Sequence, residues 1–355
     1  MHERALYLRR KRRSRTCSPN PDITERVMTM REINFMQAFN EAIREEMRRD
    51  KTVFFMGEDV QLPVFGFATG LVEEFGPDRI INTPCSEAGF VGAAVGAAAS
   101  GMRPVVDISV FSFSYLAMDQ IANQAAKMRY MFGGQVKLPL VICGIAGIMG
   151  SSGGQHSDSP HAMYMAVPGL KIVIPSTPYD CKGLLKAAIR DDNPVLFFQF
   201  ISLGLLSGNI PEEDYIVPLG VADVKRKGTD VTVVAIGPMV QKALNVAEEL
   251  AQNGISLEVV DPRTLVPIDK QTITSSVKKT GRLVIADEGP RICGAAAEIA
   301  ALVVEDDDTF GCLDAPIQRV TRHHVPIPSS PVLEQFVVPD EGRIKDAVRK
   351  VLRKA

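Results

Sequence analysis

The residues best suited to chemistry lie between positions 80 and 101, in the stretch IINTPCSEAGFVGAAVGAAASG. One carboxylate, Glu87, follows an Asn-Thr-Pro-Cys-Ser turn and precedes an uncharged run of mostly glycine and alanine. This run predicts a thin helix that other backbones wrap on all sides. Two interpretations of Glu87 stay open. In the first, Ser86 caps the helix and Glu87 complements its positive end. In the second, Glu87 is a carboxyl group kept from water, suited to proton exchange with a buried ring nitrogen, and the two can hold together.

His156 is the histidine best placed for catalysis. It lies in a loop of glycines and serines, from Ala146 to Asp158, just beyond the carboxyl end of a predicted strand. Open α/β sheets bind ligands at that edge. A structural histidine bonded to a carbonyl is the alternative. Of the other histidines, His161 begins a predicted helix and the pair at 323–324 lies at a predicted surface turn.

Composition and motifs exclude several classes. The 40 basic and 42 acidic residues are balanced, so bulk charge indicates no nucleic-acid or membrane partner. No zinc-ligand spacing, Gly-x-Ser-x-Gly elbow, Walker loop or Gly-x-Gly-x-x-Gly opening occurs. The six cysteines form no Cys-x-x-Cys pair and are expected to be reduced, mostly buried thiols in a reducing compartment. No apolar run reaches the ~18 residues of a membrane span.

Strands alternate with helices along the chain, which predicts an α/β fold with parallel sheets covered on both faces. In the first unit, strands are expected at 53–56, 79–81, 104–109, 138–144, 170–174 and 195–199, and helices at 35–49, 71–75, 117–131 and 178–190. From 203 to 227 the periodicity lapses. A second βαβ unit then has predicted strands at 230–236, 256–260, 282–287 and 317–320, and predicted helices at 240–253, from 295, and around 344–352.

Domain boundaries follow from these patterns. Residues 1–30, with the run RRKRRSR, are expected to be a disordered basic tail. A transit peptide, or a folded protein that begins near Met28 or Met30, are the alternatives. The first domain is placed at 31–208, a linker at 209–228 and the second domain at 229–355.

Six short motifs occur in order: FMGEDV at 55–60, TPCSEAGF at 83–90, GMRP at 101–104, QHS at 155–157, PGLK at 168–171 and DPRT at 261–264. Together they resemble the beta subunit of the thiamine-diphosphate-dependent decarboxylating component of 2-oxo acid dehydrogenase complexes. Members of this family act on pyruvate or branched-chain 2-oxo acids, and acetoin-cleaving enzymes are close relatives. The resemblance runs from about Ile33 to the C-terminus.

The resemblance implies two three-layer α/β domains with mostly parallel sheets: a transketolase-like pyrimidine-binding domain and a transketolase C-terminal domain. Enzymes of this kind hold magnesium and diphosphate with a Gly-Asp-Gly motif that ends in Asn-Asn, and this chain has neither a Gly-Asp nor an Asn-Asn dipeptide. In the family that half of the site belongs to an alpha subunit. The chain is therefore expected to carry half of an active site within an alpha2-beta2 heterotetramer, and to share the cofactor with an alpha subunit that holds the magnesium.

The resemblance also implies roles for individual residues of this chain, through the positions at which they match the family's motifs. Glu87 matches the glutamate that bonds a pyrimidine ring nitrogen of the cofactor. His156 matches a histidine at the site mouth that donates a proton during transfer to a lipoyl group. Phe113 matches an aromatic residue on the pyrimidine ring, with a plain core phenylalanine as the alternative. Glu58 matches a position near the cofactor, and Ser109 stands where some relatives have Met or Gln, which leaves substrate choice open.

Two further assignments come from the resemblance. Asp314 matches an acid that docks the binding domain of the acyltransferase, although a solvated surface aspartate is the competing interpretation. A structural potassium ion is implied at the backbone carbonyls of Leu140, Ala188, Ile189, Asp191 and Asn193.

The predicted activity is that of an oxidoreductase with a lipoyl acceptor: oxidative decarboxylation of a 2-oxo acid, with pyruvate favoured over branched-chain substrates and with reductive acylation of the lipoyl group on the acyltransferase core. An acetoin dehydrogenase beta subunit is the alternative, and a non-catalytic assembly or tethering subunit is the alternative of another class. The expected location is the cytoplasm of a bacterium or archaeon, with the mitochondrial matrix as second choice.

Overall fold

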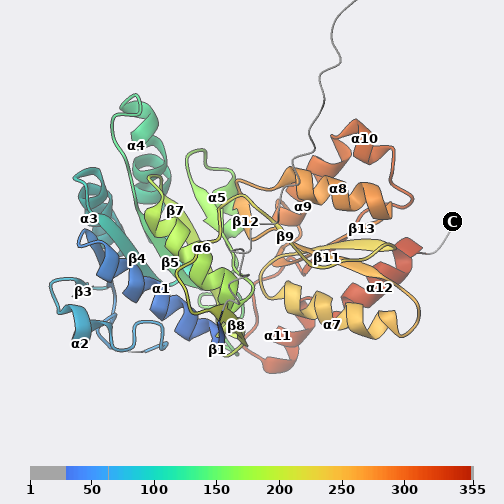
Figure 1. The fold of residues 1–355 in the computed structure, drawn as a ribbon, viewed down its shortest axis with the longest axis horizontal. Helices are drawn as coiled ribbons and strands as arrows, with labels where there is room; N and C mark the ends of the chain where they lie inside the picture. Colours follow the sequence, from blue (N-terminus) through green and yellow to red (C-terminus); the bar gives the residue numbers. More distant parts are fainter. Residues whose placement is uncertain (1–28, 63, 353–355) are drawn as a thin grey trace, which may run out of the picture.

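The computed structural model describes residues 29–62 and 64–352, so the predicted basic tail lies almost entirely outside the described residues. Figure 1 shows two α/β lobes side by side, the first in blue to green and the second in yellow to red. The tail prediction of 1–30 is too long by one residue at its end, because Met30 already belongs to strand β1 (Met30–Asn34).

The first lobe is built on a seven-stranded sheet of order β12-β6-β7-β5-β4-β2-β3. Its strands are β2 (Val53–Gly57), β3 (Ile80–Asn82), β4 (Arg103–Val110), β5 (Val141–Ala146), β6 (Lys171–Val173), β7 (Val195–Phe200) and β12 (Thr264–Val266). All neighbours pair in parallel except β12, which joins β6 antiparallel. Strands β2, β5 and β7 are buried along their whole length, as expected of parallel strands covered by helices on both faces.

The second lobe has a five-stranded sheet of order β14-β13-β10-β11-β9. Its strands are β9 (Asp223–Arg226), β10 (Val231–Ala235), β11 (Leu257–Asp261), β13 (Leu283–Pro290) and β14 (Gln318–Arg322), and only β9 runs antiparallel. Side chains alternate between two cores along these strands. Val233 and Val259 face α7 (Met239–Ala251) and α12 (Glu341–Leu352), whereas Val234 and Val260 belong to the core that contains residues of α8 (Lys270–Thr280) and α9 (Ala295–Val304). This alternation makes three layers and confirms the predicted fold class.

Helices cover the first sheet as predicted. Helix α1 (Phe35–Arg49) packs against α6 (Pro178–Arg190), and α3 (Glu87–Ala99) packs against β4. The shorter helical segments are α2 (Leu71–Phe75), α5 (His161–Met165), η3 (Ile201–Leu203), α10 (Asp307–Phe310) and α11 (Pro331–Val337).

One prediction of local structure was wrong. The stretch 203–227 is not featureless, because it contains β8 (Ser207–Pro211), which pairs with β1, as well as β9. Both strands are short and partly exposed, so they lack an apolar pattern. The helix predicted at 117–131 is present but irregular: a 3-10 segment η1 (Phe111–Ala117) leads into a π-helical segment η2 (Gln120–Ala125), which α4 (Ala126–Met131) continues. π-Helical turns are frequent at functional sites.

Cysteines are less buried than expected. Of the five in the described part, none is in a disulfide; Cys143 and Cys181 are buried, but Cys85, Cys293 and Cys312 are exposed. Among the described residues, no helix combines the length and apolar character needed to cross a membrane.

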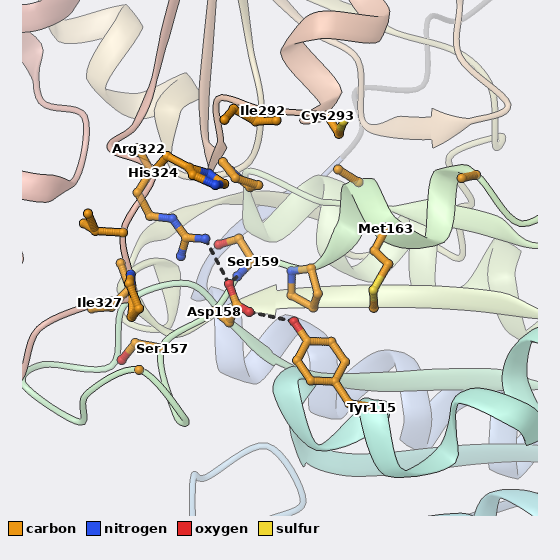
Figure 2. Close-up of a pocket in the computed structure, with 17 residues that line it drawn as sticks. Tyr115, Ser157, Asp158, Ser159, Met163, Ile292, Cys293, Arg322, His324 and Ile327 are labelled. Atoms are coloured by element: carbon orange, nitrogen blue, oxygen red, sulfur yellow. Dashed lines mark hydrogen bonds and ion pairs between the residues drawn. The ribbon is translucent and has the colours of Figure 1, made fainter.

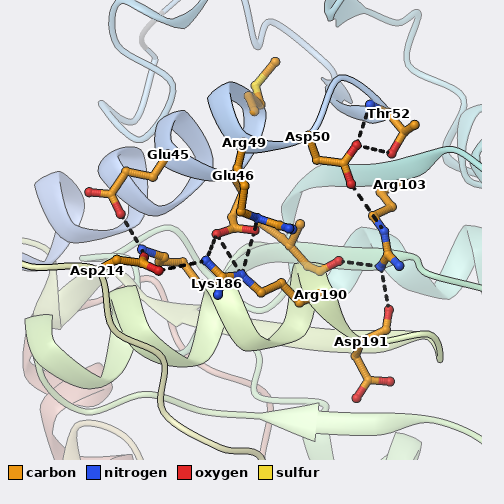
Figure 3. Close-up of polar contacts among 12 residues, drawn as sticks. Glu45, Glu46, Arg49, Asp50, Thr52, Arg103, Lys186, Arg190, Asp191 and Asp214 are labelled. Atoms are coloured by element: carbon orange, nitrogen blue, oxygen red, sulfur yellow. Dashed lines mark hydrogen bonds and ion pairs between the residues drawn. The ribbon is translucent and has the colours of Figure 1, made fainter.

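Buried charges join α1 to α6, as Figure 3 shows. Glu46 is fully buried and accepts a hydrogen bond from Arg190 at 2.6 Å. Lys186, also fully buried, donates to Glu45 at 2.5 Å and to Asp214. Each of these two buried charges has an opposite partner, so neither is left uncompensated in the interior.

A second charged cluster joins the two lobes. Arg263 contacts Asp180 of α6 at 2.7 Å and Asp223 of β9 at 2.9 Å. Lys225 contacts Asp180 at 2.5 Å and lies 3.9 Å from Asp261. The cluster thus has three carboxylates and two cations. Burial, together with the charge of Asp180, raises the pKa of Asp261 to about 7.

We therefore predict that Asp261→Asn changes the pH dependence of stability. Between pH ~4 and ~7 the folded wild type keeps a proton on Asp261 that the unfolded chain has lost, so its stability falls as the pH rises through this window. The variant lacks this loss. Its free energy of unfolding, measured by urea unfolding and compared with that of the wild type, should therefore be about 1–3 kcal/mol higher at pH 8.5 than at pH 5. Asp308→Asn, at an exposed side chain, is the control. An unchanged difference between Asp261→Asn and wild type at the two pH values would contradict the assignment.

Candidate active site

Glu87 is the first residue of α3 and is only 8 % exposed. Ser86 occupies the N-cap position, but its side chain makes no capping hydrogen bond within the described part of the chain, so that part of the first interpretation was wrong. Glu87 itself lies in the first turn, where a negative charge is stabilised by the helix dipole. The structure therefore combines the helix-end position with a carboxyl group kept from water.

Helix α3 is not wrapped on all sides in the single chain. One face, with Phe90, Val91 and Ala94, is buried and packs toward β4, η1 and η2. The other face is exposed and apolar, and it consists of small residues: Ala88, Gly89, Ala93, Gly96 and Ala99. A Cβ built at Gly96 would meet no described atom within 4 Å. The small residues therefore leave an open apolar face next to Glu87.

Phe113 and His156 are brought together from two neighbouring strands. Phe113 follows β4 and His156 follows β5, and these strands pair in parallel. Their rings meet edge to face, with centroids 5.4 Å apart and an interplanar angle of 81°. Ser112 supports this contact by donating from its hydroxyl to the carbonyl of Gln155 at 2.5 Å. Phe113 is half-buried and His156 is exposed, so the histidine is accessible to a group that arrives from outside.

Glu58 and Ser109 meet at a small cavity of ≈ 70 Å³ that also contains Asp107. Ser109 has a left-handed backbone (φ +61°), and its amide donates to a carboxylate oxygen of Asp107 at 2.8 Å. Burial raises the pKa of Asp107 to about 6, and the charge of Glu58 adds to this shift. Asp107 was not predicted as a site residue. The signal for it was a carboxylate inside an otherwise apolar strand, RPVVDISV.

The loop that carries His156 is closed by a bond from the amide of Gly147 to the carbonyl of Asp158, at 2.8 Å. Gly147 has φ +79°, and a Cβ there would lie 2.5 Å from a carboxylate oxygen of Glu288 in the second lobe. The same oxygen accepts a hydrogen bond from the amide of Ile148 at 3.0 Å. The second lobe therefore fixes the start of this loop, through a residue that sequence reasoning missed.

The five carbonyls predicted to bind potassium lie at the opposite edge of the sheet: Leu140 precedes β5, Ala188 and Ile189 are in the last turn of α6, and Asp191 and Asn193 lie between α6 and β7. Arg103 donates there to the carbonyls of Ile189 at 2.9 Å and Asp191 at 3.1 Å, and Figure 3 shows its guanidinium against this end of α6. Leu140 and Ala188 accept backbone hydrogen bonds. Across the described residues, no group of three or more His, Cys, Asp or Glu side chains could hold a metal ion. The potassium site stays a prediction.

Asp314 lies on the second lobe, between α10 and β14. Its side chain is 58 % exposed and pairs with Arg282 at 3.1 Å. It borders an open, mainly apolar groove of ≈ 690 Å³ whose lining includes Val304, Phe310 and Leu313. The structure therefore places Asp314 beside an apolar surface, and its docking role stays a prediction.

Comparison with known families identifies both lobes. Residues 31–200 match the family described as transketolase, pyrimidine binding domain, and residues 220–344 match the family described as transketolase, C-terminal domain. A solved split gene transketolase, an inactive beta4 tetramer, has the same fold, with a TM-score of 0.73 at 24 % identity over 90 % of this chain and 98 % of that one. The chain therefore belongs to the class of proteins with paired transketolase-type domains.

Relatives narrow the class further. The beta subunit of acetoin:2,6-dichlorophenolindophenol oxidoreductase from Bacillus subtilis is 44 % identical over 336 residues, which are 91 % of this chain and 98 % of the relative. The pyruvate dehydrogenase E1 component subunit beta of Rickettsia felis is 44 % identical over 322 residues (90 % and 98 %), and the mitochondrial subunit beta-1 of Arabidopsis thaliana is 44 % identical over 325 residues (90 % and 88 %). The chain is a member of the family of beta subunits of thiamine-diphosphate-dependent 2-oxo acid dehydrogenase components. The family predicted from the six motifs is confirmed, as is its enzyme class, oxidoreductase.

The residues present fit part of such a cofactor. Among the described side chains, Glu58 Oε1, Thr83 Oγ1 and Gln120 Oε1 are buried oxygens without a hydrogen-bond partner. Gln120 lies on η2 and packs close to Gly92 of α3, and Thr83 is in the turn before α3. Buried acceptors without partners are costly, and an aminopyrimidine ring offers the N–H donors that they lack.

We predict that Gly147→Ala destabilises the protein by about 1–3 kcal/mol, because the new methyl group would collide with Glu288 and because alanine disfavours a positive φ. Gly96→Ala is the matched control. It lies on the open face of α3 and should stabilise the single chain by about 0.5–1 kcal/mol. Urea unfolding of both variants checks the pair; a Gly147→Ala protein as stable as wild type would show that the loop does not need this close approach.

Proposed function

We propose that this chain is the catalytic beta subunit of an alpha2-beta2 component that oxidatively decarboxylates a 2-oxo acid and passes the acyl group to a lipoyl group. The observation that carries the proposal is Glu87, a carboxyl group that is 8 % exposed at the start of a helix whose neighbouring face is open and apolar. A buried carboxyl group of this kind is suited to proton exchange with a ring nitrogen.

Each of the chain's own residues has a distinct task. Thiamine diphosphate, when bound, supplies the electron sink for decarboxylation. Glu87 would hold and return a proton at the pyrimidine nitrogen, and Phe113 would pack against that ring. Glu58 would accept from an N–H donor at its unpartnered oxygen. His156, exposed beside Phe113, would donate a proton to the lipoyl sulfur as the acyl group is transferred.

A second subunit would complete the site. The sequence has no diphosphate-binding motif, so we assign the magnesium and the diphosphate to an alpha subunit. The exposed face of α3 fits its docking, since small residues allow a second backbone to approach closely. Leu116 on η1, which packs against α3, is exposed as well, and together these surfaces form an apolar patch of the kind that marks an interface.

The acyltransferase core is the further partner that we propose. Asp314 would contribute a charge at the edge of the apolar groove formed by α9 and α10, which suits a small domain with a basic rim. A potassium ion at the five carbonyls would act structurally. For location we propose the bacterial or archaeal cytoplasm, a reducing compartment that fits the unpaired cysteines.

Pyruvate is the substrate we favour, with branched-chain 2-oxo acids or acetoin as alternatives. The identity is 44 % to both an acetoin and a pyruvate relative, so it does not separate these substrates. Ser109 lines the small cavity beside Glu58, and a pocket of this kind discriminates a methyl from a larger chain by only ~1–3 kcal/mol.

We predict that Glu87→Gln lowers decarboxylation by the reconstituted alpha–beta pair about 10²–10⁴-fold, because an amide cannot exchange the proton. The assay follows substrate oxidation with an artificial electron acceptor. Glu73→Gln, an exposed glutamate on α2, should leave the rate unchanged. Full activity of Glu87→Gln would instead favour a non-catalytic assembly subunit.

We predict a different defect for His156→Ala. Decarboxylation with the artificial acceptor should persist, whereas reductive acylation of a lipoyl domain should fall about 10²-fold or more, because the proton donor is lost. His323→Gln serves as the control, since this exposed histidine stacks on Phe336 in the second lobe. Equal loss of both half-reactions would contradict a role limited to lipoyl transfer.

A further inference from the structure

The carboxylate of Asp158 lies at the junction of three elements, two residues after His156. One oxygen accepts from the hydroxyl of Tyr115 at 2.6 Å. The other accepts from the guanidinium of Arg322 at 3.1 Å and from the amide of Ser159 at 2.8 Å. Figure 2 shows this Tyr115–Asp158–Arg322 chain at the wall of a cavity of ≈ 660 Å³ between the two lobes.

Each partner of Asp158 ties the histidine loop to a different part of the molecule. Tyr115 is on η1, two residues after Phe113, so its bond fixes the loop to the segment that carries the aromatic site residue. Arg322 ends β14 in the second lobe, and its side chain is only 11 % exposed. Charge-assisted bonds of this kind are stronger than neutral ones. Burial, and then the neighbouring Asp158 carboxylate, raise the pKa of Tyr115, so it stays a protonated donor at neutral pH.

The second lobe holds the rest of the loop as well. Glu288 accepts from the amide of Ile148 at 3.0 Å, and Glu334 accepts from the amide of Ser151 at 2.6 Å. Ser151 has a positive φ of 66°, a conformation that costs energy for a residue with a side chain. The loop between Ala146 and Asp158 has mostly small side chains, so contacts from outside must set its shape.

We infer that Asp158 is a positioning residue for His156, and that Tyr115, Asp158 and Arg322 form a clamp that sets the imidazole against Phe113. This inference rests on the proposed function for its catalytic consequence. The clamp touches the histidine loop and η1 but not Glu87. Loosening it should therefore impair transfer to the lipoyl group and spare decarboxylation.

Tyr115→Phe and Asp158→Ala test the clamp in the assembled alpha–beta protein. The first removes one hydroxyl and keeps the ring; the second removes the junction. Reductive acylation of a lipoyl domain should fall about 10-fold or more, as expected when a catalytic group is displaced by a fraction of an ångström, while decarboxylation with an artificial acceptor stays within about 2-fold of wild type. Tyr130→Phe, at a tyrosine that is 89 % exposed, should change neither rate.

Two further measurements separate positioning from general damage. Hydrogen exchange at the amides of residues 147–157 should be faster by about 10-fold in Tyr115→Phe and unchanged at α3. In a His156→Ala background, Asp158→Ala should cause no additional loss of lipoyl transfer, because the residue acts through the imidazole.

Unchanged exchange in the loop, additive losses in the double variant, or equal loss of both half-reactions would each overturn the inference. If the wild-type pair does not decarboxylate any 2-oxo acid, the proposed function fails, and the hydrogen-exchange comparison still decides whether the clamp orders the loop.

Discussion

The burial of one carboxyl group at the start of α3 is the constraint on which the rest of the site depends. A charged side chain is kept from water only where it has an opposite charge or a hydrogen-bond partner, or where it takes up or releases a proton and becomes neutral. Glu87 has the positive end of α3 beneath it and an open apolar helix face beside it. The glycines and alanines that follow it leave room for a second polypeptide chain to approach closely and exclude water.

The two edges of the first sheet have different tasks. At the carboxyl edge, the segments after β2, β4 and β5 carry Glu58, Phe113 and His156. At the amino edge, Arg103 donates to the carbonyls of Ile189, in the last turn of α6, and of Asp191, just after it. The second lobe does more than stabilise the first, because Glu288, Glu334 and Arg322 reach across to the loop that holds His156. The position of this loop in the first lobe therefore depends on the second lobe.

Much of this could be predicted from local signals in the sequence. The apolar strands and amphipathic helices fixed the α/β class, and motifs such as TPCSEAGF and QHS indicated the family that the comparisons confirmed. The missed features depend on contacts between distant segments. Strand β8 has no apolar pattern because it pairs with β1 at a partly exposed edge. Asp158 and Arg322 are 164 positions apart, and neither residue type indicates by itself that they meet beside the loop that carries His156. The exposed face of α3 looked buried in the sequence because a glycine–alanine helix has no polar side to mark the surface.

The most direct test of the central claim is the rate at which the thiazolium carbon of the bound cofactor exchanges its proton for deuterium, followed by NMR in the reconstituted alpha–beta protein. If Glu87 relays the proton, exchange should be fast in wild type and slower by orders of magnitude in Glu87→Gln with the cofactor still bound. Equal exchange rates in the two proteins would contradict the account.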